Sequence, residues 1–206
     1  MSLFCRFFII MKKIIMLAFI LFTFKCYSQS GVVVPRGTIG SLDVPNGAYL
    51  KDIDNEYLPY VGTWKAIKDN KEYTFVFQVF YHHLKSYPNG DNHYEDVLKA
   101  KYEVKDITTG IVLFTTMSAV NYEDFLISAL STPYEGGRLD FYFCDIAHCY
   151  NTMTFSLIRI PGSTIQLKYG IFSFGDWWSP EDCPAYSERT DVPVPIPETW
   201  VIYNKQ

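Results

Sequence analysis

The chain has 206 residues, of which 17% are aromatic and 19% charged, and its formal net charge is −4 at pH 7. This length fits a single domain, since domains typically contain roughly 100 to 200 residues. An acidic chain without a basic patch argues against nucleic-acid binding.

The first 28 residues have the pattern of a secretory signal peptide. Lys12 and Lys13 precede an unbroken apolar run over residues 14–24, and "KCYSQS" follows with small residues before the expected cleavage point. We expect translation to begin at Met11 and cleavage to follow Ser28. The apolar run is shorter than the ~20 residues of a membrane span. The mature chain is therefore expected to have no transmembrane span and to reach the periplasm or the extracellular space.

A lipoprotein anchor at Cys26 is the alternative to cleavage after residue 28. Such an anchor requires a small residue directly before the cysteine, and this chain has Lys25 there. Cleavage after residue 28 also removes four basic residues and moves the net charge from −4 to −8. The mature protein is thus expected to be still less suited to nucleic acid.

The remaining chain divides into a Gly/Pro-rich lead over residues 29–56 and a single β domain over residues 57–206. Alternation of apolar and polar residues predicts strands throughout the domain, because side chains of a strand point alternately to opposite faces. The segment "NYEDFLISAL" fits a helical turn or a strand. The predicted strands lie within residues 61–67, 73–84, 97–104, 111–118, 138–146, 151–160, 164–172 and 199–205.

The opening of the domain, "YVGTWKA", resembles the start of the lipocalin superfamily. The mature chain also looks like a family of small exported bacterial proteins of unknown function. The lipocalin resemblance implies an all-β, antiparallel, lipocalin-like (calycin-type) barrel of about eight strands, with a sandwich as the alternative. It implies that Gly62 lets the chain bend into the barrel and that Trp64 closes the barrel floor. Two departures are the missing Thr-Asp-Tyr turn and the missing arginine after the final strand.

A barrel of this kind predicts a ligand site in its interior. Phe75 and Phe77 share one face of their predicted strand, and Phe141 and Phe143 share one face of theirs. We expect these four rings to line the interior and to face a small apolar ligand.

A second candidate site is the acidic loop "FGDWWSPEDCPAYSE". Trp177 and Trp178 are adjacent there, so an extended segment cannot direct both rings into one core. An exposed indole beside carboxylates would suit a glycan or a protein surface. The alternative is that both tryptophans hold the loop over the barrel.

The cysteines indicate an oxidising compartment. Cys144 and Cys149 lie at either end of an expected hairpin loop, and we predict a disulfide between them. Free thiols and a metal site that includes His148 are the alternatives, although C-x4-C is not the usual zinc spacing. Cys183 is then free or bonded to another molecule.

No catalytic constellation, cofactor motif or metal motif is found. His82 and His83 are adjacent on a strand and point to opposite faces unless a bulge intervenes. Asp140 and Asp145 also lie on opposite faces, which does not suit paired-carboxylate catalysis. We therefore expect a non-enzymatic protein that binds a small apolar ligand or no ligand at all, with a carbohydrate- or protein-binding module that uses Trp177 and Trp178, or a structural envelope protein, as alternatives.

Overall fold

The computed structural model describes residues 31–38, 43–145, 151–174, 181, 183–188, 191–192 and 194–206. Residues Val33–Gln206 form one compact unit, built almost entirely of strands. Two short 3-10 helices, η1 (Leu58–Tyr60) and η2 (Tyr122–Asp124), lie between strands. The strands are β1 (Val33–Pro35), β2 (Tyr49–Lys51), β3 (Gly62–Lys68), β4 (Lys71–Ser86), β5 (Asn92–Asp106), β6 (Val112–Thr115), β7 (Ile127–Ala129), β8 (Arg138–Asp145), β9 (Asn151–Arg159), β10 (Gln166–Phe174) and β11 (Val201–Lys205).

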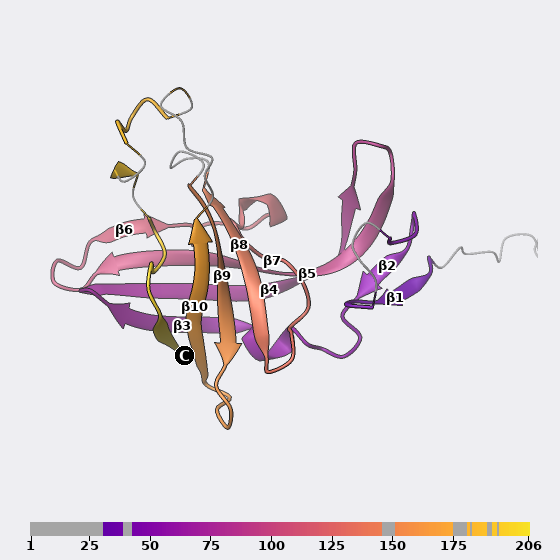
Figure 1. Ribbon diagram of the computed structural model, residues 1–206, viewed down its shortest axis with the longest axis horizontal. Coiled ribbons are helices and arrows are strands. Elements are labelled where there is room, and N and C mark those ends of the chain that lie inside the picture. Colours follow the sequence, from indigo (N-terminus) through magenta and orange to yellow (C-terminus); the bar gives the residue numbers. More distant parts are fainter. Residues whose placement is uncertain are drawn as a thin grey trace, which may run out of the picture. The chain divides into compact units, whose positions relative to one another are not determined.

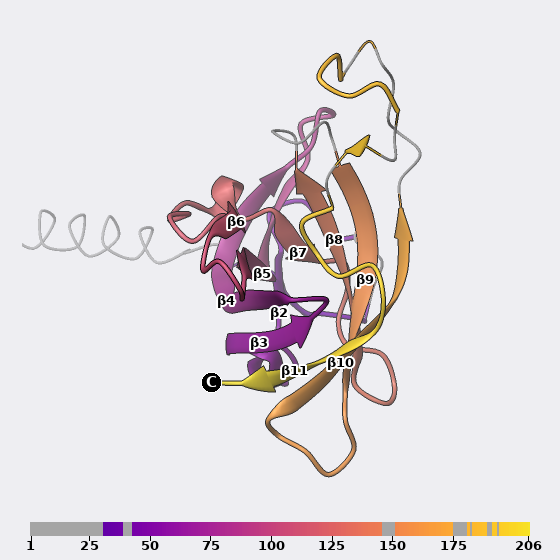
Figure 2. The same ribbon diagram turned by 90° about the vertical axis from the view of Figure 1, so that its left-hand side faces the viewer.

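Eight of these strands close into an antiparallel barrel. The order around the barrel is β3-β4-β5-β7-β8-β9-β10-β11, and β11 returns to β3 by pairing Lys205 with Trp64. Strands β8, β9 and β10 cross in front of β3, β4 and β5 in Figure 1, and Figure 2 shows the same wall from the side. The prediction of an all-β, antiparallel barrel of eight strands is confirmed.

The barrel is closed by a strand that the sequence pattern did not single out. Strand β6 corresponds to the predicted segment 111–118 and pairs with β5, but it lies off the path around the barrel. The connection from β5 to β8 is made by β7, through Lys99↔Ser128 and Ala100↔Ile127. The segment "NYEDFLISAL" thus contains both a helical turn, η2, and a strand, β7.

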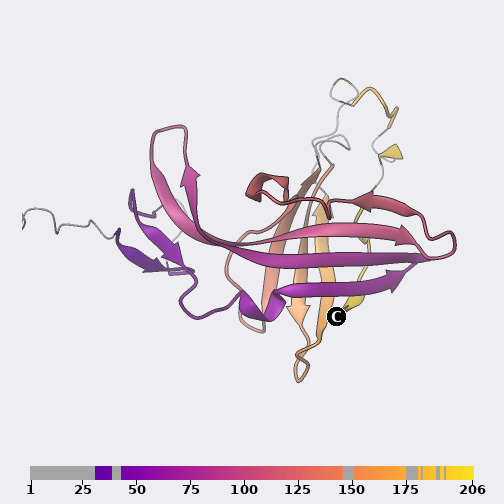
Figure 3. The ribbon, with the colours of Figure 1, turned by 180° about the vertical axis from the view of Figure 1, so that it is seen from behind.

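Strands β4 and β5 continue past the barrel as a long hairpin (Figure 3). Strand β3 pairs with β4 only as far as Gly62↔Phe77, whereas the hairpin ladder extends to Ser86↔Asn92. A bulge lies between Phe80 and His83 in this ladder. Bulges bend a strand and increase its twist, so the hairpin diverges from the barrel wall here.

The Gly/Pro-rich lead adds two short strands to this hairpin. Strand β2 runs parallel to β5, with Tyr49 opposite Tyr94, and β1 runs parallel to β2, with Val33 opposite Tyr49. The contact continues past the end of β1, because the N–H of Arg36 donates to the carbonyl oxygen of Lys51 at 2.8 Å. The lead is thus part of the sheet near the hairpin.

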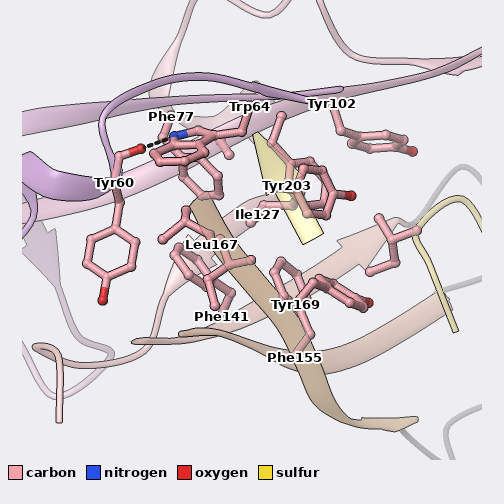
Figure 4. Packing of buried hydrophobic residues seen from close by; sticks show 14 of the residues in the cluster. Tyr60, Trp64, Phe77, Tyr102, Ile127, Phe141, Phe155, Leu167, Tyr169 and Tyr203 are labelled. Carbon is pink, nitrogen blue, oxygen red and sulfur yellow. Dashed lines mark hydrogen bonds between the residues drawn. The ribbon is translucent and has the colours of Figure 1, made fainter. Parts of the chain in front are cut away.

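The barrel interior is filled by aromatic and branched side chains (Figure 4). Phe75 stacks on Tyr203 with ring centroids 4.8 Å apart, and Phe141 stacks on Phe155 at 5.3 Å. Burying one large apolar side chain stabilises a fold by roughly 1.5–3 kcal/mol. The interior of the described barrel is therefore a packed core, and its aromatic rings contribute much of the stability.

Within the residues that the structure describes, there is no helix long and apolar enough to cross a membrane.

The cysteines differ from the predicted arrangement. Cys144 is a free thiol, and Cys183 forms a disulfide. The predicted bridge between Cys144 and Cys149 is therefore wrong. Strand pairing continues to Asp145↔Asn151, so Cys144 lies inside the ladder opposite Thr152 and not at the neck of the loop. Cys149 and His148 lie outside the described residues.

Alkylation of the protein without reductant is expected to modify Cys144 and to leave Cys183 unmodified, because Cys183 forms a disulfide. Intact-mass analysis before and after reduction measures the number of accessible thiols. The variant Cys144→Ser is the control and is expected to lose the alkylation. Modification of Cys183 without reductant would contradict this arrangement.

Candidate functional site

A groove opens where the β4–β5 hairpin leaves the barrel wall. Its volume is about 520 Å³, and residues from the lead, the hairpin, η2, β7 and β8 line it. It forms because β5 pairs with β7 only at Lys99 and Ala100, while the outer part of β5 pairs with β2. Its charged lining residues are Arg36, Lys85 and Glu95, and its aromatic ones are Tyr122, Tyr134 and Tyr142.

Two cations share one carboxylate at the side of the groove formed by the lead and the hairpin. Arg36 Nη1 lies 3.1 Å from Glu95 Oε2, and these side chains are only 9% and 7% exposed. Lys85 Nζ lies 3.3 Å from the other oxygen, Glu95 Oε1. Arg36 Nε is buried and has no hydrogen-bond partner among the described residues. Burial alone would lower the pKa of Arg36, but Tyr57 and Glu95 together raise it above its usual value.

His93 lies beside the same carboxylate but does not neutralise it. Its Nε2 is 3.9 Å from Glu95 Oε2 and is buried without a hydrogen-bond partner in the described part of the chain. Burial lowers the pKa of His93, and the nearby Lys85 and Arg36 lower it further. Glu95 raises this pKa, but its effect is smaller than the other three combined. The lowered pKa disfavours the charged form of His93, and Glu95 is balanced by Arg36 and Lys85.

The neighbouring carboxylate, Asp96, has a structural role on the opposite face of β5. It is fully buried, and it accepts hydrogen bonds from the Tyr49 hydroxyl, the Asp52 N–H at 2.9 Å and the His82 N–H at 3.0 Å. His82 has a positive φ of 54°, an uncommon conformation for a residue other than glycine. Its ring stacks on Tyr94 at 4.0 Å. Asp96 thus joins the lead to the bulge and does not face the groove.

Tyrosine rings form the other side of the groove. The ring of Tyr122 stacks on His83 at 3.4 Å, and Lys99 Nζ lies 3.8 Å from the Tyr122 ring centroid. Lys99 Nζ also donates to the Tyr122 carbonyl oxygen at 2.7 Å. Burial raises the pKa of Tyr122 to about 12 and lowers the pKa of Lys99. Tyr134 and Tyr142 are 54% and 40% exposed, so their rings are available to a ligand.

The four phenylalanines predicted to face a ligand lie inside the barrel. None is more than 2% exposed, and none lines the groove. Phe77 packs on Phe75 at 5.8 Å and on Phe141 at 5.1 Å, while Phe143 packs on Tyr102 at 5.6 Å. The structure brings these rings together as part of the core. The second candidate pair, Trp177 and Trp178, lies outside the described residues.

Gly62 and Trp64 lie at the start of the barrel wall. Gly62 has a φ of 117°, and a Cβ there would approach Lys205 Cε to 3.2 Å. Trp64 is 1% exposed, and its Nε1 donates to the Tyr60 carbonyl oxygen at 2.6 Å (Figure 4). Lys205 Nζ lies 5.3 Å from the Trp64 ring centroid. A lysine of the final strand thus contacts the tryptophan where an arginine was sought in the sequence.

No group of three or more histidine, cysteine, aspartate or glutamate side chains within the described ranges could hold a metal ion. His82 lies within the bulge and stacks on Tyr94, whereas His83 pairs with Glu95 at the end of the bulge and stacks on Tyr122.

Comparison with known proteins gives a family without an assigned activity. Residues 11–135 match DUF6705, a family of unknown function. This segment includes Arg36, Lys85 and Glu95 of the groove, together with strands β1 to β7. No curated protein and no solved structure matches the chain. Because the match covers more than half of its length, the chain belongs to the DUF6705 family of unknown function.

Proposed function

We propose that the protein is an exported, non-enzymatic binding protein that holds a saccharide in the groove beside the barrel. The observation that carries this proposal is the combination of tyrosine rings and a fixed Arg36–Glu95 pair around one pocket of about 520 Å³. This volume lies within the ~300–1,000 Å³ of ordinary ligand sites. Export is supported by the signal-like first 28 residues.

The chemistry of the lining suits a sugar. A sugar ring has an apolar C–H face, which packs on aromatic surface, and hydroxyls, which both donate and accept hydrogen bonds. Tyr134 and Tyr142 offer partly exposed rings with a hydroxyl at the end. Arg36 supplies fixed donors and Glu95 fixed acceptors. The hydroxyls of Ser128, Ser131 and Thr132 also line the groove.

Binding of an apolar ligand inside the barrel is less well supported. Phe75, Phe77 and Phe141 contact one another or other core rings directly, so a ligand would have to displace packed side chains. A lipocalin-like origin of the fold still finds support in the positive φ of Gly62 and in the Lys205–Trp64 contact. We therefore propose a lipocalin-like barrel whose binding site lies beside the wall.

Tyr142→Ala is expected to weaken saccharide binding about tenfold, because it removes a half-exposed ring of the groove. The measurement is retention on an oligosaccharide array, followed by titration of the members that bind. The matched control is Tyr81→Ala, since Tyr81 is 68% exposed on the hairpin and does not line the groove.

Two results would contradict the groove as the site. Retention that survives Tyr142→Ala but is lost in the double variant Trp177→Ala, Trp178→Ala would assign binding to the tryptophan loop. Uptake of a fluorescent fatty acid without any glycan retention would instead assign it to the barrel interior.

A further inference from the structure

The groove contains more positive than negative charge. Arg36 and Lys85 both contact Glu95, so this cluster has one positive charge in excess. Lys99 lies behind the Tyr122 ring, and the acidic group that acts on it, Glu123, is exposed on η2. The chain as a whole is acidic, with a net charge of −4. An excess of cations in this groove therefore goes against the composition of the molecule.

The nearby titratable groups do not remove this excess. Burial lowers the pKa of His93, which disfavours its charged form. Asp96 lies on the opposite face of β5, where three donors use its oxygens. Glu95 is thus the carboxylate that faces Arg36 and Lys85 among the described residues.

One donor of the cluster is left without an acceptor. Arg36 Nη1 donates to Glu95, but Arg36 Nε has no partner in the described part of the chain, although the side chain is only 9% exposed. A buried donor without a partner is unfavourable, and a guanidinium binds oxyanions through neighbouring N–H groups. Arg36 and Lys85 both line the groove, so an oxyanion bound there would meet the Lys85 ammonium, whose side chain is 41% exposed, beside the Arg36 guanidinium.

We infer that the saccharide held in the groove is acidic, and that its anionic group is bound by Arg36 and Lys85. This inference rests on the proposed function, because it assigns the chemical class of the ligand to the same groove. Lys99 attracts the same group from behind Tyr122 without contacting it.

The test uses the secreted protein and a panel in which each uronic-acid or sulfated oligosaccharide is paired with its neutral counterpart, such as an oligogalacturonate with its methyl ester. The acidic member of a pair is expected to bind about tenfold more tightly at low ionic strength, in line with one charge-assisted contact. This preference is expected to shrink as salt is added. Lys85→Met is expected to remove most of it, while Lys168→Met, an exposed lysine on β10 outside the groove, leaves it unchanged.

Equal binding of acidic and neutral members, with loss of both in Tyr142→Ala, would overturn the acidic-ligand inference and leave the groove as the saccharide site. A preference for acidic members that survives Lys85→Met would also overturn it. Binding of no member of the panel would instead overturn the proposed function. The melting temperature of each variant, compared with wild type, separates lost binding from lost folding.

Discussion

Replacement of Trp64 by alanine is expected to lower the free energy of unfolding by about 3–5 kcal/mol, the range for truncating a large buried aromatic side chain. Trp64 is 1% exposed, so the substitution leaves a cavity at the start of the barrel wall. It also removes the donor to the Tyr60 carbonyl oxygen and the ring beneath Lys205 Nζ. Urea unfolding followed by circular dichroism measures the change.

The chain supplies a matched control for this experiment. Trp200 is 65% exposed, and Trp200→Ala is expected to change the free energy of unfolding by only about 0.5 kcal/mol. Trp64→Phe is expected to fall between the two, because it keeps apolar volume and loses the hydrogen bond. If Trp64→Ala unfolded at the same urea concentration as Trp200→Ala, Trp64 could not be a main core residue of the barrel.

The barrel was predictable because its long strands alternate over many residues. Strand β4 has Tyr73, Phe75 and Phe77 buried in succession at every second position, which is the pattern that identifies a half-buried strand. The closing strand β7 could not be identified in this way, because Ile127–Ala129 is too short to show a period. Its place in the barrel depends on the pairing with β5 and β8, which a single sequence does not reveal.

The contact of Lys205 with Trp64 corresponds to a cation within the final strand and not after it. The lipocalin resemblance implies an arginine after the final strand, whereas in this chain a lysine within that strand lies opposite Trp64 in the β11–β3 pairing. Either cation can lie over an indole ring. A cation–π contact with Trp64 therefore requires only a long cationic side chain at the position that pairs with it, here Lys205.

The groove was not predictable from the sequence. Its central pair, Arg36 and Glu95, is separated by 59 positions in the chain. Arg36 lies in a lead whose strands β1 and β2 have three residues each and pair in parallel, so neither alternation nor a hairpin turn identifies them. One signal was present: an arginine directly after the apolar run "VVVP" is a candidate for a buried charge. Its partner could be found only from the fold.

Replacement of Glu95 by alanine is expected to lower the free energy of unfolding by about 3–5 kcal/mol, as in other proteins where one partner of a buried ion pair is removed. The variant leaves Arg36, which is 9% exposed, without its carboxylate and removes the partner of Lys85 as well. Releasing β1 from β2 would let more water reach Arg36. Urea unfolding measures the total effect, and hydrogen exchange at the Arg36 amide, which is bonded to Lys51, measures the local release.

Two comparisons identify the buried charge as the cause. Glu72 pairs with Lys65 at 2.8 Å on the half-exposed barrel surface, so Glu72→Ala is expected to lower the free energy of unfolding by no more than about 1 kcal/mol.

The double variant Arg36→Met, Glu95→Leu removes both charges and keeps the volume, and it is expected to recover most of the stability lost in Glu95→Ala. Equal losses for Glu95→Ala and Glu72→Ala, with unchanged exchange at Arg36, would mean that water already reaches the pair. In that case the groove would hold Arg36 too loosely to position it for a ligand.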